Sequence, residues 1–283
     1  MSSLKLKIND FAKPGNLDTQ KLFDVSYIEP KKSSIDTFFI KTKTLNTLIV
    51  DPNNVDVQLT NLILLGYVSA VESYFRGIIR KSISIDMLSK KTCENQLLTF
   101  GAAISHDKEL LPEALLEKCT FINKENINES LKNYLGLKGQ FPSDVENVLE
   151  QYGIVCQLRH CIVHRFGLLG SNNAIKLGLS EHKEFLEKPL KINYSSLQEV
   201  FLICNNTVKV FNNYLFQRLL QRSVEECGCW QWNYNKDKKL FNKYFTIFYS
   251  GQYPPTPNVI AKDIYNQFRL KSHEYNKSKK WKP

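Results

Sequence analysis

Apolar residues recur at intervals of three and four along three long stretches of the chain. In residues 57–80 the apolar positions are Leu59, Leu62, Ile63, Val71, Tyr74, Phe75, Ile78 and Ile79. The same spacing returns in residues 144–166, and again from Ser195 or Ser196 to about Arg222. This periodicity places apolar side chains on one face of an α-helix. We therefore predict three long amphipathic helices.

Turn residues and helix caps separate these stretches. The sequence Asp51-Pro52-Asn53-Asn54 is a turn and start signal before the first helix. Shorter helices are expected between residues 83 and 135, with Pro112 in the first turn of one and Asn123 as the N-cap of another. Residues 135–139 include two glycines and interrupt the helical pattern. These breaks divide the chain into helices joined by turns.

Residues 57–222 are predicted to form an antiparallel helical bundle, so the fold class is mainly α. Smaller additions are expected on either side of this bundle. Residues 1–56 mix two β-favouring pieces, Leu4–Ile8 and Phe38–Lys43, with turn residues, and the sequence assigns them no role. Residues 223–283 form a basic, aromatic-rich C-terminal extension.

The C-terminal extension combines positive charge with aromatic residues. It holds 13 of the chain's 33 aromatic residues and +6 of the net charge of +10. This charge favours an acidic partner such as nucleic acid, unless it only reflects a Lys- and Asn-rich composition. We expect Phe241, Phe245 and Phe248 to pack onto the bundle. Lys277–Lys282 is expected either to contact RNA or to form a disordered end.

The composition is that of a soluble globular protein, with 42% apolar residues in a chain of 283. No uninterrupted apolar run approaches the roughly 18 residues that span a bilayer, and the N-terminus lacks the apolar region of a signal peptide. The seven scattered cysteines predict reduced thiols, hence a cytoplasmic protein without membrane contact. The sequence contains no Gly-rich phosphate loop and no Gly-x-Ser-x-Gly elbow, which disfavours nucleotide hydrolysis and serine chemistry.

Candidate chemistry is concentrated at the end of the predicted helix over residues 144–166, in the run Arg159-His160-Cys161-Ile162-Val163-His164. RNA cleavage by transesterification requires a base for the 2′-hydroxyl, a cation for the phosphorane and an acid for the 5′-oxygen. Imidazoles titrate near neutral pH and suit the first and third of these tasks, while the Arg fork suits the phosphate. This chemistry needs no metal or other cofactor, and it excludes DNA because DNA lacks the 2′-hydroxyl.

This run resembles the signature of the HEPN domains, and specifically of their ribonuclease branch. Those proteins are helical bundles with an Arg, a polar residue and, four to six positions after the Arg, a His. Arg159 matches the Arg, His160 the polar position and His164 the final His. The helix order is also similar, with an acidic residue, Glu72, on the first helix and one long helix after the motif. The resemblance implies that Arg159 and His164 are catalytic and that His160 assists. Glu72 and Arg165 are candidates for substrate-binding or supporting residues because of their positions in the sequence.

The resemblance also implies partners. Arg159 and His164 lie about 140° apart around a helix, so they need not share a face. HEPN domains pair as homodimers in which two motif helices form one cleft, and a homodimer is therefore expected here. The implied function is a metal-independent endoribonuclease that cuts tRNA, mRNA or rRNA. Its implied role is that of a toxin or anti-phage defence effector, restrained by an antitoxin or triggered by an activating partner.

Three alternatives stay open at this point. Cys156, His160 and His164 share one helical stripe and could bind a metal ion, although three ligands on one straight helix span about 12 Å. The two His residues could instead pack or cap between helices while Arg159 pairs with an acid. A HEPN-like bundle could also bind RNA or a protein without catalysing a reaction.

The two supporting residues also have ordinary interpretations. Glu72 could form an i,i+4 ion pair with Arg76, which is the favoured interpretation, or it could reach across the bundle to orient Arg159. Arg165 directly follows the motif and could contact a phosphate, although exposed Arg residues are common.

Overall fold

A computed structural model of the protein describes residues 6, 8–9, 15–253, 255 and 258–280, with side chains up to Tyr275. Contacts divide the chain into two compact units, residues 1–31 and residues 32–283. In the first unit the described residues form one short 3-10 helix, η1 (Thr19–Leu22), which has no buried residue. All other helices of the described residues belong to the second unit.

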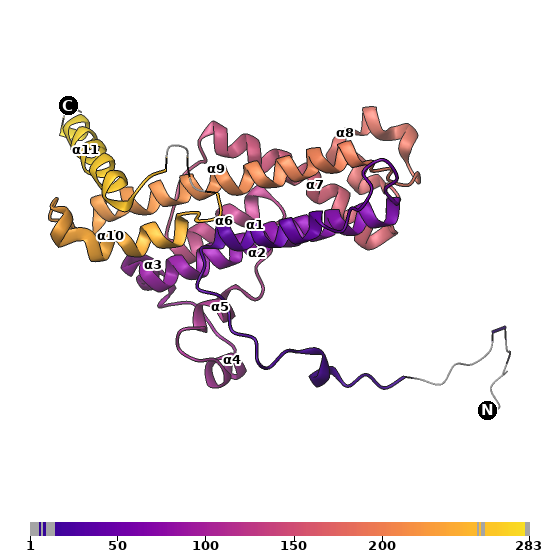
Figure 1. Cartoon of the computed structure of the whole chain (residues 1–283), viewed down its shortest axis with the longest axis horizontal. Coiled ribbons are helices and arrows are strands. Elements are labelled where there is room, and N and C mark those ends of the chain that lie inside the picture. Colours follow the sequence, from indigo (N-terminus) through magenta and orange to yellow (C-terminus); the bar gives the residue numbers. More distant parts are fainter. Residues whose placement is uncertain (1–5, 7, 10–14, 254, 256–257, 281–283) are drawn as a thin grey trace. The chain divides into compact units, whose positions relative to one another are not determined.

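The second unit is built from helices joined by short loops (Figure 1). In chain order they are α1 (Ser34–Asn46), α2 (Val57–Ile85), α3 (Met87–Cys93), α4 (Phe100–Ser105), α5 (Leu111–Leu116), α6 (Lys124–Leu135), α7 (Ser143–Arg165), α8 (Ser171–His182), η2 (Lys183–Phe185), α9 (Tyr194–Glu226), α10 (Tyr234–Phe248) and α11 (Ala261–Lys280). No β-strand occurs among the residues that the structure describes. The prediction of a mainly α fold is confirmed.

The predicted helix starts agree with the structure, whereas α2 and α9 continue to Ile85 and Glu226, beyond their predicted ends at residues 80 and 222. Asp56 caps α2 by accepting hydrogen bonds from the backbone N–H groups of the first turn, at 2.8 and 3.0 Å. Asn123 caps α6 as predicted, because its Oδ1 accepts from the Asn126 N–H at 2.8 Å. Gly136 ends α6 in the left-handed region, with φ of 67°, and Pro112 lies in the first turn of α5. Local side-chain chemistry therefore sets where these helices begin and end.

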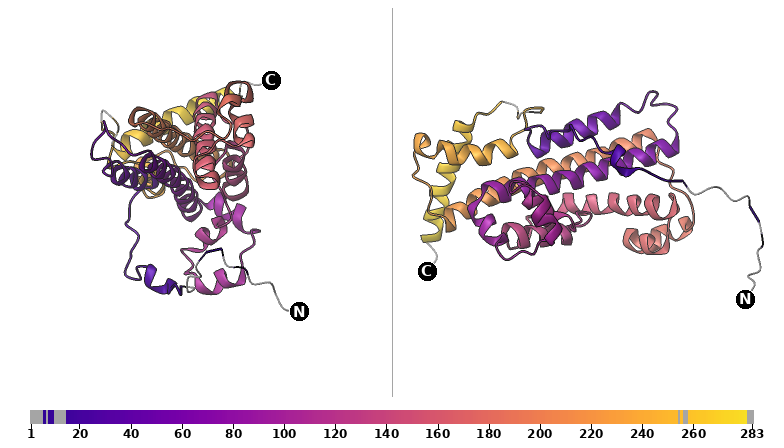
Figure 2. Two further views of the ribbon diagram at one scale, coloured as in Figure 1. Left: turned by 90° about the vertical axis from the view of Figure 1, so that its right-hand side faces the viewer. Right: turned by 90° about the horizontal axis from the view of Figure 1, so that it is seen from below.

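Four helices, α1, α2, α7 and α9, alternate in direction and form an antiparallel bundle (Figure 2). Tyr67 of α2 bonds to Asn46 at the end of α1, whereas Gly77, further along α2, lies beside Ser34 at the start of α1. Thr207 of α9 donates to the Val148 carbonyl of α7 at 3.1 Å. Gly167, directly after α7, lies beside the Asn61 side chain in the first turns of α2, so the end of α7, which carries the motif, is near the start of α2.

The expectation of β-favouring structure at Phe38–Lys43 is wrong, because these residues lie inside α1. Ser33 caps this helix by accepting from the Asp36 N–H at 3.3 Å, and Ile35, Phe38 and Phe39 are buried against the bundle. Helical spacing and burial against α2 thus outweigh the strand propensity of the aromatic and branched residues. The other piece, Leu4–Ile8, lies outside the described residues apart from two of its positions.

Helix α2 supplies much of the core. Its side chains at Val71, Phe75, Ile78 and Ile79 are completely buried. Phe75 also makes an edge-to-face contact with Phe211 of α9, with ring centroids 4.7 Å apart. Burying an apolar side chain of this size contributes about 1.5–3 kcal/mol. The contacts of α2 with α1, α7 and α9 therefore fix the position of the motif helix.

The C-terminal extension packs onto the bundle. Phe241 and Phe248 of α10 are buried and Phe245 packs partly buried beside them, as predicted. Helix α9 continues past residue 222, and α10 packs against both α2 and α9, so packing is continuous across the predicted boundary. The expectation for Lys277–Lys282 falls outside the described side chains.

Helix α2 is also long and apolar enough to cross a membrane, by length and composition. Slightly more than half of its most apolar window, 56%, is buried inside the bundle. The core helix of a soluble protein has the same properties, and so does a membrane span.

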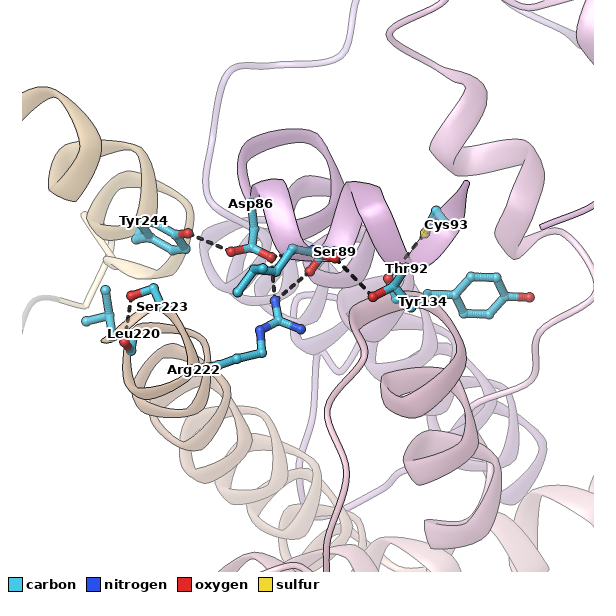
Figure 3. A network of polar contacts seen from close by, with 10 residues as sticks. Asp86, Ser89, Thr92, Cys93, Tyr134, Leu220, Arg222, Ser223 and Tyr244 are labelled. Carbon is cyan, nitrogen blue, oxygen red and sulfur yellow. Dashed lines mark hydrogen bonds and ion pairs between the residues drawn. The ribbon is translucent and has the colours of Figure 1, made fainter. Parts of the chain in front are cut away.

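A buried polar network joins the junction of α2 and α3 to α9 and α10 (Figure 3). Arg222 is 4% exposed, and its guanidinium forms an ion pair with Asp86 and donates to the Ser89 hydroxyl at 3.0 Å. Tyr244 donates its hydroxyl to the second oxygen of Asp86 at 2.6 Å, and Asp86 also caps α3 by accepting from the Ser89 N–H at 2.6 Å. Burial raises the pKa of Tyr244. The network ties three segments of the bundle together with nearly every group paired.

Candidate functional site

The motif lies on the last two turns of α7. Arg159 and His160 are half-buried, and His164 is exposed. The imidazoles of His160 and His164, one helical turn apart, lie nearly face to face, with ring centroids 5.6 Å apart and ring planes at 25°. The structure therefore brings together two of the three residues that the sequence singled out.

These two imidazoles line a hollow of about 380 Å³. Its lining is polar and consists of Gln157, His160, His164, Arg165, Gly170, Ser171, Asn172, Asn173 and Lys176. Arg165 and Lys176 supply positive charge, and the lining includes no acidic side chain. Cations, imidazoles and amides are the groups that bind a phosphate. The hollow is therefore suited to an anionic ligand.

A small second core holds α8 against the end of α7. Cys161, Leu169 and Ala174 are buried together in it. The Asn173 amide of α8 also donates to Oε1 of Gln157 on α7, at 3.2 Å. These contacts fix the two walls of the hollow relative to each other.

The chain reverses sharply after α7. Phe166 ends the helix in the left-handed region, with φ of 52°, and Gly167 follows with φ of 96°. The guanidinium of Arg165 pairs with Glu187 in an exposed ion pair of 2.5 Å. Arg165 thus keeps an acidic partner at the surface while it lines the hollow.

The pKa of His160 is lowered from its ordinary value. Burial is the largest cause, followed by the positive charge of Arg159, by His164 and by Lys176, while Glu72 acts in the opposite direction. Burial and nearby cations both disfavour the protonated imidazole. The surroundings of His160 therefore favour its neutral form, which can accept a proton.

Arg159 does not line the hollow. Within the described part of the chain its guanidinium makes neither a hydrogen bond nor an ion pair. It lies close enough to Cys156 and His160 to affect the pKa of each. The expectation that Arg159 and His164 occupy different faces of the helix agrees with this placement. A half-buried cation without a described partner is an uncommon feature in a folded protein.

Glu72 forms neither of the two ion pairs considered for it, as far as the described contacts extend. Its Oε1 accepts from the Phe121 N–H at 3.4 Å. Arg76 instead lies 3.9 Å from Glu113 and donates to backbone carbonyls, one of them that of Cys119 at 3.0 Å. The prediction of a Glu72–Arg76 ion pair is therefore wrong. The charge of Glu72 raises the pKa of His160 and of Cys156 on the motif helix.

The metal-binding alternative finds no support in the geometry. Among the described residues no three His, Cys, Asp or Glu side chains gather closely enough to hold a metal ion. Cys156 is fully buried, and burial raises the pKa of its thiol to about 12, whereas His164 is exposed. Cys156 therefore faces the core and His164 faces solvent, which separates the proposed ligands.

The sequence interpretation missed several residues of the hollow. Gln157 lies three positions before His160 and seven before His164, so helical spacing could have identified it. Lys176 and Asn172 come from α8, after a sharp turn, and no pattern in the sequence joins them to α7. Comparison with family models, curated proteins and solved structures finds no match for this chain.

Proposed function

We propose that the protein is a metal-independent endoribonuclease that cleaves RNA by attack of a 2′-hydroxyl on the adjacent phosphate. The observation that carries this proposal is the pair of facing imidazoles, His160 and His164, in a hollow that also holds Arg165 and Lys176. The resemblance of the motif to the HEPN ribonucleases supports the same reaction. A toxin or defence role, restrained by an antitoxin or triggered by a partner, rests on that resemblance alone.

The proposed reaction assigns one task to each group. Neutral His160 removes the proton of the 2′-hydroxyl, whose oxygen forms a new bond to phosphorus. His164 acts as the general acid and donates a proton to the 5′-oxygen as the bond from phosphorus to that oxygen breaks. Arg165 and Lys176 stabilise the negative charge of the phosphorane. The products are a 2′,3′-cyclic phosphate and a 5′-hydroxyl.

Arg159 enters the proposed site through a second copy of the chain. It is left without a described partner, and Val163, which lies about 40° from Arg159 around α7, has an apolar side chain that is 48% exposed. In a homodimer that covers this surface, Arg159 of one copy would contact a phosphate in the hollow of the other. Each subunit then supplies part of each site.

The reaction is tested with RNA in excess EDTA. We expect wild-type protein to cut single-stranded RNA, to leave 2′,3′-cyclic phosphate ends, and to leave DNA of the same sequence intact. Arg159→Ala and His164→Ala should each lower the rate at least about a hundredfold. Cleavage that requires added metal ions, or products with a 3′-hydroxyl, would exclude the proposed mechanism.

The shared site is tested by mixing inactive variants. Arg159→Ala keeps His164, and His164→Ala keeps Arg159, so a mixed dimer contains one complete composite site. We expect the mixture, after subunit exchange, to recover cleavage that neither variant has alone. If the mixture is as inactive as its components, the site is not shared between subunits: either Arg159 and His164 act within one subunit, or one of them lies outside the site.

A second candidate function is favoured by the position of Arg159. In a single chain Arg159 does not line the hollow, so one copy could hold RNA without cleaving it. In that case the protein would be a non-catalytic RNA-binding or protein-binding module. RNA binding by the wild-type protein without cleavage in any condition of the EDTA experiment would select this function.

A further inference from the structure

Phe166 has an unusual backbone and an unusual environment. It ends α7 in the left-handed region, at φ 52° and ψ 35°, where glycine or asparagine is normally found. Its side chain is 79% exposed, so burial does not compensate for the strained backbone. Gly167 follows directly, also with positive φ. A bulky aromatic residue thus occupies a costly position without packing against the protein.

The place of Phe166 in the chain puts it beside the hollow. It is two residues after His164, so their Cα atoms are at most about 7.6 Å apart. Arg165, the residue between them, lines the hollow. The lining itself contains no Phe, Tyr or Trp side chain. Phe166 is therefore an exposed aromatic residue whose backbone directly follows a residue that lines this positively charged, imidazole-lined site.

We propose that Phe166 stacks on an unpaired base of RNA whose phosphate occupies the hollow, which makes single-stranded RNA the substrate class. This inference rests on the proposed function of the same site. An exposed ring stacks on any base that is free of its neighbours, while cations beside it hold the phosphate. In a duplex the bases are already stacked, so the ring has no base to contact. Phe166 is a positioning residue, which places the nucleotide next to the scissile phosphate.

Other exposed apolar side chains lie on α7, α8 and η2, so a protein contact is the competing use of Phe166. Ile175 is 61% exposed, Leu179 is 45% exposed and Phe185 is 57% exposed. None of these residues has the strained backbone of Phe166 or directly follows the motif. Phe185 is therefore a suitable control, since it is an exposed aromatic residue with an ordinary backbone that does not adjoin the motif.

The test measures binding separately from cleavage. The probe is a single-stranded 2′-O-methyl RNA with 2-aminopurine at successive positions, because it cannot supply the attacking hydroxyl. We expect wild-type protein and Phe166→Trp to quench the fluorescence of one position. Phe166→Gly should lose that quenching and raise the Kd roughly tenfold, since one stacked base is lost. Phe185→Ala should bind like wild type.

Folding and assembly are measured on the same variants. Glycine suits the left-handed region, so Phe166→Gly should unfold at the same temperature as wild type or higher. Unchanged quenching and Kd in Phe166→Gly would overturn the inference. The inference would also be overturned if Phe166→Gly no longer forms a dimer but each subunit still binds RNA as in wild type, because Phe166 would then be an interface residue. Duplex RNA bound as tightly as single-stranded RNA would also overturn it.

The inference and the proposed function fail in different ways. If Phe166→Gly loses quenching while unmodified RNA is never cut, the stacking role holds and the nuclease proposal fails. If Arg159→Ala abolishes cleavage while Phe166→Gly cleaves single-stranded RNA with wild-type KM and kcat, the stacking role fails and the nuclease proposal holds.

Discussion

Two arginines in the same bundle have opposite surroundings. Arg222 is 4% exposed, forms an ion pair with Asp86 and donates to Ser89, within a network that Tyr244 completes (Figure 3). Arg159 is half-buried, and no described residue pairs with it. Burying a cation costs free energy unless it is paired, so a fold under selection for stability alone would pair both. The proposed function accounts for this difference, because a cation that binds a phosphate has to be left without a partner in the protein, whereas Arg222 stabilises the fold.

The His residues extend this comparison. The Arg222 network places each charge beside its opposite, whereas His160 lies beside Arg159 and Lys176, which lower its pKa. Groups whose ionisation is disfavoured by their surroundings are concentrated at functional sites. Variants that distinguish stability from activity therefore test the comparison most directly.

The largest expected effect follows removal of the acid in the Arg222 network. Asp86→Ala leaves Arg222 buried without its partner and removes the cap of α3, so we expect a loss of about 3–5 kcal/mol in the free energy of unfolding. Urea unfolding measures this loss. The control is Asp263→Ala, an exposed acid in the first turn of α11. Equal stability of the two variants would show that the network does not stabilise the bundle.

A smaller effect is expected from the tyrosine of the same network. Tyr244→Phe removes one hydrogen bond to the buried carboxylate of Asp86 and should cost about 1.5–3 kcal/mol. Tyr249→Phe is the matched control, because its hydroxyl bonds to Asn258 at 2.8 Å at the surface. Thermal or urea unfolding of both variants decides the point. If Tyr244→Phe loses as little unfolding free energy as the control, the hydrogen bond from Tyr244 to Asp86 does not stabilise the protein.

The exposed ion pair at the site should matter little for stability. Glu187→Gln breaks its pairing with Arg165, and we expect a change of about 0.2–1 kcal/mol in the free energy of unfolding. It also releases a cation of the hollow, so RNA should bind more tightly at low salt. Binding titrations at two salt concentrations measure this. Weaker RNA binding by Glu187→Gln would contradict the assignment of Arg165 to phosphate.

The smallest expected effect is on the titration of His160, measured by NMR. The midpoint of this titration should lie below 6.5, the ordinary pKa of a histidine. Arg159→Ala should raise the midpoint, because a nearby cation is removed. Since the folded-state pKa is the lower one, the unfolded chain binds more protons as pH falls through 6.5. His160 therefore makes the protein less stable at acidic pH, and His160→Gln should lose less stability between pH 7 and pH 5 than wild type. An unmoved midpoint in Arg159→Ala would contradict their coupling.

Long periodic segments could be predicted from the sequence, and contacts between segments could not. The helices at 57–80 and 144–166 were predicted because their apolar spacing is regular and their caps are local. Phe38–Lys43 was misassigned, because burial against α2 decides its structure and propensity does not. The Glu72–Arg76 pair was wrong because Arg76 meets Glu113, a residue reached only by folding.

The candidate site shows the same division. His160 and His164 were found from their spacing on one helix. Lys176 was missed because α8 reaches the hollow through the left-handed turn at Phe166 and Gly167, and no periodic pattern predicts the direction of such a turn.

The most direct test measures stability and activity on one preparation of Arg159→Ala, beside wild type. We expect its free energy of unfolding to stay within about 1 kcal/mol of wild type, because no described hydrogen bond or ion pair is lost. We expect its rate of RNA cleavage in excess EDTA to fall at least about a hundredfold. Unchanged cleavage together with a loss of stability like that of Asp86→Ala would contradict the account, since Arg159 would then be a structural residue like Arg222.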